Sequence, residues 1–314
     1  MRTGVVAALA CFACVPCGCG NARGDDDGAT PWHAVELPEG VASLQSVWSF
    51  APDDVWLAAD SGKLLHFDGS EWTTTTLNPA VTVVALMGFA PDAIVGVGGS
   101  SLARYDGSAW TVEDLTAANV GIESVSSVWG TATDDLWVGG DQSTAAHFDG
   151  TTWTRTIAGS TDNVALWGSA TDDVWIGGVF DVAHFDGTTW TTVDGLDHGA
   201  AAIWASATDD VWVADGDELS HFDGSGWTAT ELDGVGGISA MWGFASDDLW
   251  GVGDFATIAH YDGQRWDVLD RQHAGSPYLR QLLDVHGSGP GDLWAVGAEL
   301  GESGATPLLW RIDG

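Results

Sequence analysis

The chain has 314 residues and a formal net charge of −36, because 45 acidic residues stand against only 9 Lys and Arg. A surface this negative repels nucleic acid and anionic lipid headgroups, which excludes DNA or RNA binding and favours a soluble monomer. With 43 Gly and 19 Trp, the composition combines tight turns with large apolar rings.

Residues 1–19 predict an export signal. Arg2 precedes an apolar stretch, Val5 to Pro16, that is too short to span a bilayer, and small residues follow it. All four cysteines lie in or just after this stretch, so the exported domain has no disulfide framework. They are Cys11, Cys14, Cys17 and Cys19.

The same segment resembles a bacterial lipoprotein signal, in which a Cys after a small residue is lipidated and becomes the new N-terminus. The resemblance implies lipidation at Cys19, which follows Gly18, with Cys17 as the second choice and plain secretion as the alternative. Residues 20–30 are polar and contain three consecutive Asp, which predicts a flexible acidic tether.

From residue 31 onward, a unit of about 38 residues recurs seven times, and this repetition decides the fold. Each unit has four landmark positions. The first holds Trp48, Met87, Trp129, Trp167, Trp204, Trp242 and His286. The second holds Trp56, Val95, Trp137, Trp175, Trp212, Trp250 and Trp294. The third holds Phe67, Tyr105, Phe148, Phe185, Phe222, Tyr261 and Ile312, and the fourth holds Trp32, Trp72, Trp110, Trp153, Trp190, Trp227 and Trp266.

Between the landmarks, stretches rich in Val, Ile, Leu, Thr and Trp are cut by Asp-Asp, Gly-Gly and Asp-Gly. These are short strands bounded by turn residues, and no helical period is present. Four strands per unit predict the blade of a β-propeller. Because the Trp positions are fixed by the repeat, we predict that they pack blade against blade, and sugar binding by exposed Trp rings is the alternative.

The two ends of the chain are complementary. The last unit stops after Arg311–Gly314, where the other units continue into their fourth strand, and residues 32–37 match that strand as it occurs at 72–77. We therefore predict an all-β, seven-bladed propeller of four-stranded blades over residues 31–314. An N-terminal strand at about 31–37 completes its last blade. An open solenoid, the competing fold, gives no reason for these two halves.

Acidic residues follow the turns. Because successive strands are antiparallel, the first-to-second and third-to-fourth turns of every blade emerge on one rim. The first turn carries Asp pairs at 53/54, 134/135, 172/173, 209/210 and 247/248, with single Asp92 and Asp292. The other turn carries Asp68, Asp106, Asp149, Asp186, Asp223, Asp262 and Asp313. We predict that these Asp accept hydrogen bonds from their own turns and need no cofactor. Bound Ca²⁺ is the alternative, although no D-x-D-x-D-G loop is present.

One histidine recurs just before the third landmark, and Arg104 and Arg311 replace it in two units. The histidines are His66, His147, His184, His221 and His260. A hydrogen-bond donor at the same place in every blade predicts a structural role in packing, with each side chain bonded to a neighbouring turn. Five histidines dispersed around a ring do not predict a metal or catalytic site.

The repeat breaks near the last blade, and loops on a rigid scaffold commonly carry binding. We therefore predict a binding site there. The alternative is that the last blade tolerates sequence changes that have no function. A long connection supplies cations, the last second-to-third loop supplies Glu299 and Glu302, and His286 stands where Trp is expected. The connection contributes Arg271, His273, Tyr278 and Arg280.

The pattern Val-Trp-Gly-x-Ala-x-Asp-Asp-Val-Trp with His-Phe-Asp-Gly-x-x-Trp-Thr resembles repeats of the WD40/YVTN/BNR-like propeller superfamily. It is most similar to those of uncharacterised bacterial repeat lipoproteins. The resemblance covers residues 31–314 and implies the fold. Sialidases of that group carry an Asp-box, but here the stretch from Asp149 to Trp153 is one residue shorter and lacks the leading Ser. Sialidase activity is therefore not implied.

These observations predict an exported, lipid-anchored, non-catalytic module that binds an extracellular protein or glycan. We expect it at the outer membrane or cell surface, or else in the periplasm or medium, with membrane contact only through the lipid. The alternative is a BNR/sialidase-like hydrolase or lyase of an extracellular polymer, with its chemistry near His273 and His286.

Overall fold

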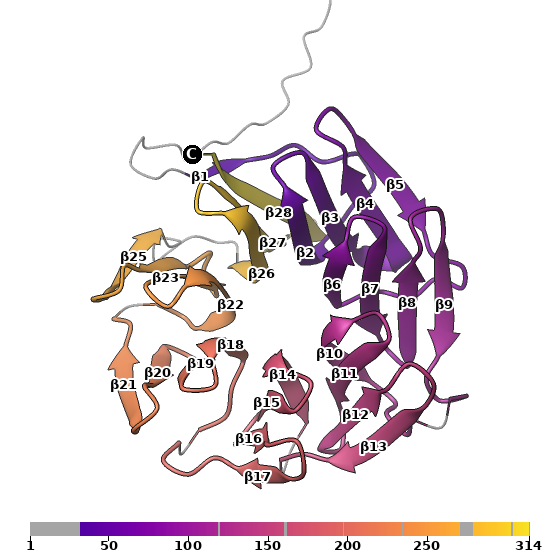
Figure 1. Ribbon diagram of the computed structural model, residues 1–314. Helices are drawn as coiled ribbons and strands as arrows, with labels where there is room; N and C mark the ends of the chain where they lie inside the picture. Colours follow the sequence, from indigo (N-terminus) through magenta and orange to yellow (C-terminus); the bar gives the residue numbers. More distant parts are fainter. Residues whose placement is uncertain are drawn as a thin grey trace, which may run out of the picture.

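Figure 1 shows seven four-stranded sheets arranged around a central axis in the computed structural model of the chain. The structure describes residues 32–118, 120–159, 162–196, 198–233, 235–270, 279–302 and 304–313. In those ranges the one helical element is a single 3-10 turn, Asp60–Gly62, and no helix is long and apolar enough to cross a bilayer. The predicted signal, tether and lipidation site at Cys19 lie outside the described residues.

Each blade runs from an innermost strand at the axis to an outermost strand. Blades 1 and 2 are β2 (Leu44–Ala51), β3 (Asp54–Ala59), β4 (Lys63–Phe67), β5 (Trp72–Thr76), and β6 (Ala85–Ala90), β7 (Ala93–Gly98), β8 (Ser101–Tyr105), β9 (Trp110–Asp114). Blades 3 and 4 are β10 (Val125–Ala132), β11 (Asp135–Gly140), β12 (Thr144–Phe148), β13 (Trp153–Ile157), and β14 (Asn163–Ala170), β15 (Asp173–Gly178), β16 (Val182–Phe185), β17 (Trp190–Thr192). Blades 5 and 6 are β18 (Ala202–Ala207), β19 (Asp210–Asp215), β20 (Glu218–Phe222), β21 (Trp227–Glu231), and β22 (Ile238–Ala245), β23 (Asp248–Gly253), β24 (Ile258–Tyr261), β25 (Trp266–Asp270). Blade 7 is β26 (Leu279–Gly289), β27 (Asp292–Gly301), β28 (Gly304–Asp313) and β1 (Trp32–Ala34).

The N-terminal strand closes the ring, as predicted. β1 pairs antiparallel with β28, so that Trp32 lies opposite Ile312 and Ala34 lies opposite Trp310. The Val35 N–H donates to the Leu309 carbonyl at 2.8 Å. The paired segment is shorter than the predicted 31–37, because the chain turns away from β28 after Val35 to reach blade 1.

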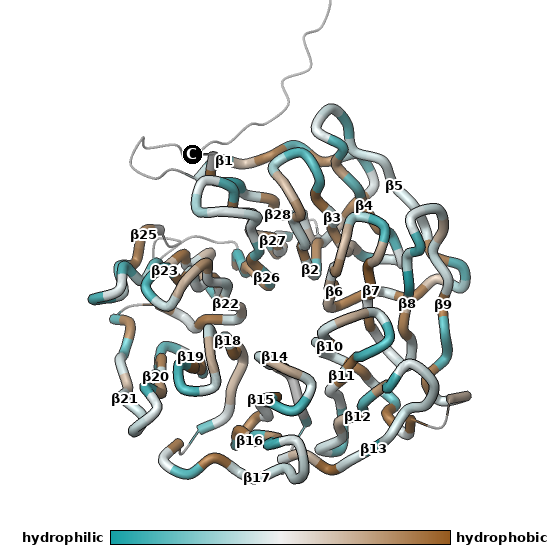
Figure 2. The backbone as a smooth tube through the Cα atoms, viewed as in Figure 1, coloured by the Kyte–Doolittle hydropathy of each residue, from teal (hydrophilic) through white to brown (hydrophobic). Residues whose placement is uncertain are grey.

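The core lies between blades. The second strands, such as β3 and β11, are buried along almost their whole length, and in Figure 2 hydrophobic stretches follow the strands while many turns are hydrophilic. Second-strand Trp rings of one blade meet fourth-strand Trp rings of the next edge-on, with centroids 5.5–6.2 Å apart. The pairs are Trp56–Trp110, Trp137–Trp190, Trp175–Trp227, Trp212–Trp266, Trp250–Trp32 and Trp294–Trp72. The packing interpretation of these Trp is confirmed.

A glycine after the first landmark makes room for the preceding blade. A Cβ on Gly168 would lie 2.8 Å from the ring of Trp129, and one on Gly243 would lie 2.6 Å from Trp204. We therefore expect Gly168→Val to destabilise the ring by about 2 kcal/mol, as overpacked cores do. Thermal unfolding tests this. Gly226→Ala is the control, since nothing lies within 4 Å of that site, and equal losses in both variants would contradict the packing argument.

The outer edge of β28 is only partly covered in the described structure, because β1 pairs with three of its ten residues. Leu309 accepts from Val35 and therefore faces that edge. Residues two apart on a strand face the same way, so Pro307 faces it too. Proline has no N–H to donate, which blunts an open edge against pairing with another chain.

Candidate functional site

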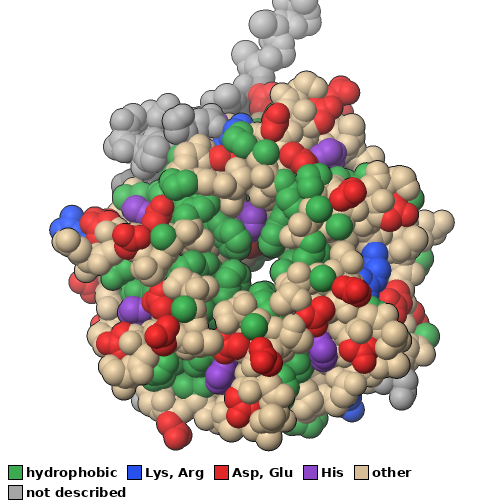
Figure 3. All heavy atoms as spheres, in the orientation of Figure 1, with side chains coloured by type: hydrophobic (Ala, Val, Ile, Leu, Met, Phe, Trp, Pro, Cys, Tyr) green, Lys and Arg blue, Asp and Glu red, His purple; other side chains and the backbone are tan. Residues whose placement is uncertain are grey.

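Both predicted sets of acidic turns lie on one rim. A Cβ on Gly69, in the third-to-fourth turn, would lie 2.7 Å from the Cβ of Asp53 in the first-to-second turn, and the same turns meet in other blades. We call this side the Asp rim and the opposite side the loop rim. Figure 3 shows the Asp rim, where carboxylates and imidazoles recur from blade to blade.

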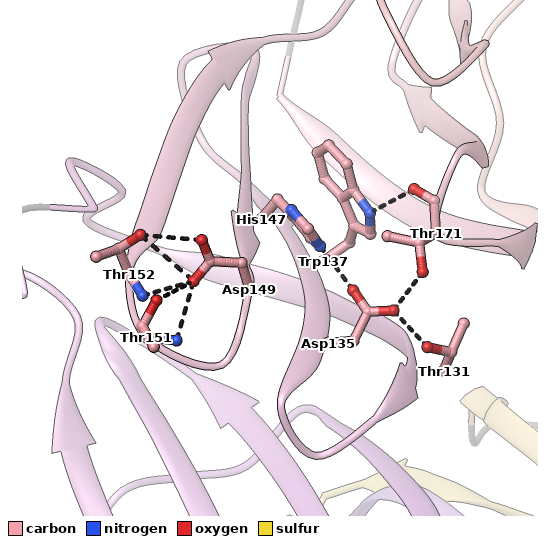
Figure 4. Close-up of polar contacts among 8 residues, drawn as sticks. All are labelled: Thr131, Asp135, Trp137, His147, Asp149, Thr151, Thr152 and Thr171. Carbon is pink, nitrogen blue, oxygen red and sulfur yellow. Dashed lines mark hydrogen bonds and ion pairs between the residues drawn. The ribbon is translucent and has the colours of Figure 1, made fainter.

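In the Asp-Gly turns, the Asp carboxylate accepts hydrogen bonds from the backbone of its own turn. Asp149 Oδ1 accepts from the backbone N–H groups of Thr151 and Thr152 at 2.9 and 2.8 Å (Figure 4). The same pair of bonds recurs at Asp68, Asp106, Asp186, Asp223 and Asp262. These hydrogen bonds lower the pKa of Asp68 and of Asp186 to about 2. The turn-capping prediction is confirmed for these six, which remain ionised at neutral pH.

The second Asp of each Asp-Asp pair anchors a polar network. In blade 3, His147 Nε2 lies 2.7 Å from Asp135 Oδ1, and Thr131 and Thr171 donate to Oδ2 (Figure 4). The imidazole stacks on Trp137 with centroids 4.7 Å apart. The other four His–Asp pairs, at 2.6–2.8 Å, are His66–Asp54, His184–Asp173, His221–Asp210 and His260–Asp248. Each repeated histidine is thus bonded to the first turn of its own blade, as a packing device.

The two arginines at this position reach the next blade, and Arg311 also contacts Asp292 of its own first turn at 3.3 Å. Blade 2 has Ala93 where the second Asp would stand, and Arg104 Nη1 donates to the Thr133 carbonyl at 2.6 Å. Arg311 Nη2 lies 3.2 Å from the Pro52 carbonyl, and its guanidinium lies 4.5 Å from the centroid of a Trp294 ring. In blade 2 the missing Asp, visible in the sequence, explains why His is replaced.

The predicted binding residues separate into three groups. Arg271, His273 and Tyr278 lie outside the described residues. Arg280 Nε donates to Glu299 Oε2 at 2.6 Å across β26 and β27, and Glu302 is exposed in the turn that follows. The structure therefore brings Arg280 and Glu299 together on the loop rim of blade 7.

His286 does not join them. It lies on β26 about 20 Å from Arg280 along the strand, and it is only 5% exposed. Its Nδ1 accepts from the Ser49 N–H at 3.1 Å, and its ring lies 4.0 and 3.8 Å from Trp48 and Trp242. The structure therefore separates His286 from the other predicted binding residues, and a role for it in binding stays a prediction. It ties blade 7 to blade 1, where a larger Trp could not accept that hydrogen bond.

Polar residues also lie at the contact between blade 7 and blade 1, which we call the closing seam, and they were not predicted from the sequence. Asp284 accepts from Ser46 Oγ at 2.6 Å and from the Val47 N–H at 2.9 Å, and Ser49 Oγ donates to Asp292 at 3.0 Å. Burial raises the pKa of Asp284 to about 6. A signal was present in the sequence, because the six other blades carry Ala or Ser where Asp284 stands.

Acidification should weaken the seam. Burial lowers the pKa of His286 to about 3, so this group favours folding above its unfolded pKa near 6.5 and loses that contribution as pH falls toward 3. The raised pKa of Asp284 acts with the opposite sign between about pH 6 and pH 4, but its shift is smaller. We expect acidification from pH 6.5 to pH 4 to be more destabilising for the full chain than for His286→Gln, in which only the opposing contribution of Asp284 remains. An equal change in the melting temperature of both proteins would contradict the assignment.

Half-buried aromatic side chains surround the axis. Trp242 meets Trp48 and Trp167 edge-on, with centroids 6.0 and 6.1 Å apart. Near the Asp-rim end of the innermost strands, three blades carry Phe where the others carry Ser or Thr. These are Phe50, Phe89 and Phe244. Figure 3 shows hydrophobic side chains around a central hollow on this face. We call it the axial hollow. Phe50 and Phe244 extend to the innermost strand of the next blade, where a Cβ on Gly88 or Gly287 would lie 2.2 or 2.9 Å from their rings, and the three Phe are the sequence signal at this end of the innermost strands.

Within the described residues, no group of three or more His, Cys, Asp or Glu side chains is placed to hold a metal ion. Six Asp-Gly carboxylates already accept the backbone donors of their own turns. The prediction of no cofactor and the alternative of bound Ca²⁺ are both untested, and melting with and without a chelator distinguishes them.

Comparison with known proteins finds no matching family model and no matching curated protein. Solved structures do match. YCF48 from Cyanidioschyzon merolae is 15% identical with a TM-score of 0.68, over 90% of this chain and 98% of that one. A structure described as YCF48 bound to D1 peptide is 15% identical with a TM-score of 0.70, over 91% and 97%. The WD40 repeats of RRP9 are 10% identical with a TM-score of 0.68, over 90% and 97%. These likenesses show the fold alone, and with its seven four-stranded sheets the chain is a seven-bladed β-propeller.

Proposed function

We propose that the chain is an exported, lipid-anchored, non-catalytic module that binds a partner protein on its Asp rim. A cationic segment of the partner occupies the axial hollow. The observation that carries the proposal is the combination on one face of half-buried aromatic rings and a ring of ionised carboxylates. Aromatic faces attract Lys and Arg, and the carboxylates accelerate and orient the approach of a cationic partner.

Two arginines of the chain itself illustrate this chemistry. The guanidinium of Arg311 sits over Trp294, and that of Arg104 lies 5.1 Å from the centroid of Phe148. Both also hydrogen-bond to first-turn carbonyls on the Asp rim. A partner's arginine would make the same kind of contact with the aromatic rings around the axial hollow. The solved propeller of similar fold described with a bound peptide supports a protein ligand over a glycan.

Binding of short peptides tests the proposal. Calorimetry with a 12-residue peptide alternating Arg and Gly should show binding that a Glu-Gly counterpart lacks. Phe50→Ser with Phe244→Ser replaces two axial rings by the residue type of blades 4 and 5, so folding should persist while affinity drops at least tenfold. Glycan-array binding without peptide binding, or peptide affinity unchanged in the double variant, would refute it.

Export, anchoring and the absence of catalysis need their own measurements. Radiolabelled palmitate should enter the protein in cells, and Cys19→Ser should abolish the label and release the protein from membranes, whereas Cys17→Ser should not. A screen of polysaccharide hydrolase and lyase substrates should show no turnover. Turnover that is lost in His286→Ala would favour the hydrolase alternative.

A further inference from the structure

The loop rim differs from the Asp rim in exposed apolar surface. Every large hydrophobic side chain that is exposed in the described residues lies on the loop rim, in a second-to-third turn, in a fourth-to-first connection or at a strand end that faces that side. They are Val84, Ile157, Val179, Phe180, Phe255, Leu269, Leu279 and Leu300. One side of the disc is thus carboxylate-rich, and the other side concentrates the exposed apolar groups.

Three of these side chains lie on one stretch of the loop rim, at blades 6 and 7. The Ala256 N–H donates to the Arg280 carbonyl at 3.1 Å, which sets the turn that carries Phe255 beside the start of β26. Leu279 and Leu300 are cross-strand partners on β26 and β27. Phe255, Leu279 and Leu300 are 46%, 43% and 51% exposed, and we call them the Phe255 patch.

The Phe255 ring packs over Gly236, where an added Cβ would lie 2.3 Å from it, yet the side chain stays 46% exposed. The φ of Phe255, +58°, lies in the left-handed region, which is unfavourable for a bulky residue. The corresponding turn of blade 3 holds Gln142 at φ +57°, and that of blade 1 holds Ser61 at +61°. Small or polar residues serve this turn elsewhere in the same chain. A half-exposed phenylalanine in a strained conformation therefore points to contact with another molecule.

Charge selects the kind of molecule. Near the patch, Asp254 accepts from Gln281 and Glu302 is exposed, while the nearby cation Arg280 is already paired with Glu299. The net charge of −36 repels a second copy and anionic lipid. We propose that the Phe255 patch docks a segment of a partner protein in which apolar side chains alternate with Lys or Arg. This surface is separate from the axial hollow and stands independently of the function proposed there.

Two synthetic peptides test the inference on the purified full chain. One alternates Leu and Lys over 12 residues, and the other alternates Ser and Lys with the same charge. By fluorescence anisotropy, the Leu-Lys peptide should bind at least tenfold more tightly than the Ser-Lys peptide. Phe255→Gln with Leu300→Gln leaves the charge unchanged and should remove that advantage. Phe255→Gln alone should keep or raise the melting temperature, because Gln142 occupies the matching turn.

Phe180→Gln is the matched control. Phe180 is 72% exposed on the same rim in blade 4, so non-specific adhesion would fall at least as much in that variant as in Phe255→Gln. The Phe50→Ser and Phe244→Ser variant separates the two proposed sites, and it should leave the Leu-Lys advantage intact.

Four results would overturn the inference. The first is equal affinity for both peptides, and the second is loss of the Leu-Lys preference in the Phe50→Ser and Phe244→Ser variant. The third is patch-dependent binding to vesicles of phosphatidylcholine and phosphatidylglycerol without peptide binding. The fourth is self-association of the full chain that is lost in Phe255→Gln. The last two would assign the patch to lipid or to a second copy.

Discussion

Deleting residues 1–35 should abolish cooperative folding or lower the melting temperature by more than 10 °C. The deletion removes β1, uncovers β28 and leaves Trp250 without the edge-on contact of Trp32, which is only 7% exposed. Burying one such ring contributes about 4 kcal/mol, and a kilocalorie shifts the midpoint of a domain of this size by about 3 °C. Differential scanning calorimetry would measure the change.

Deletion of residues 1–30 is the control, because it keeps Trp32 and the rest of β1 and should melt like the full chain. A synthetic peptide of residues 31–37, added to the shorter protein, should restore part of the lost stability, since it binds the folded ring alone. If both deletions melted alike, the strand would not be what closes the ring.

Replacing Asp135 with Ala should cost about 3 kcal/mol, or about 8 °C in melting temperature, because it leaves several polar groups without their partner. His147, Thr131 and Thr171 all bond to this carboxylate, and Thr171 belongs to the next blade. Thermal and urea unfolding of the variant would measure the loss.

Blade 2 provides the compensating change. It carries Ala93 and Arg104 where blade 3 carries Asp135 and His147. Adding His147→Arg to Asp135→Ala reproduces that pair, and the new guanidinium should reach the first turn of blade 4. We expect recovery of about half the loss. A double variant less stable than Asp135→Ala would show that the two residues are not exchanged as a unit.

The sequence predicted the architecture well because the repeat carries it locally. The Asp-Gly turns, the Trp landmarks and the complementary ends each encode a short-range rule that every blade obeys. Even the His–Asp pairs could be anticipated in kind, since a donor and an acceptor recur at fixed places in one blade.

The candidate site was harder to predict because it depends on contacts between blades. His286 looked like a break in the repeat near a variable loop, whereas the ring places it in the seam with blade 1. The axial hollow depends on the innermost strands of several blades, which carry Phe50, Phe89 and Phe244 at positions far apart in sequence. The Phe255 patch could not be predicted, because it depends on the backbone conformation of a turn, which the amino-acid sequence alone does not give.

A designed disulfide between β1 and β28 tests the closed ring most directly. Ala34 and Trp310 are direct partners in the antiparallel register, a spacing that a disulfide can bridge. In a protein without the four N-terminal cysteines, Ala34→Cys with Trp310→Cys should cross-link quantitatively under mild oxidation, as peptide mass spectrometry would show. Ala34→Cys with Ala305→Cys, about 17 Å away along β28, should not. The absence of the first cross-link, or equal yields of both, would contradict the closure.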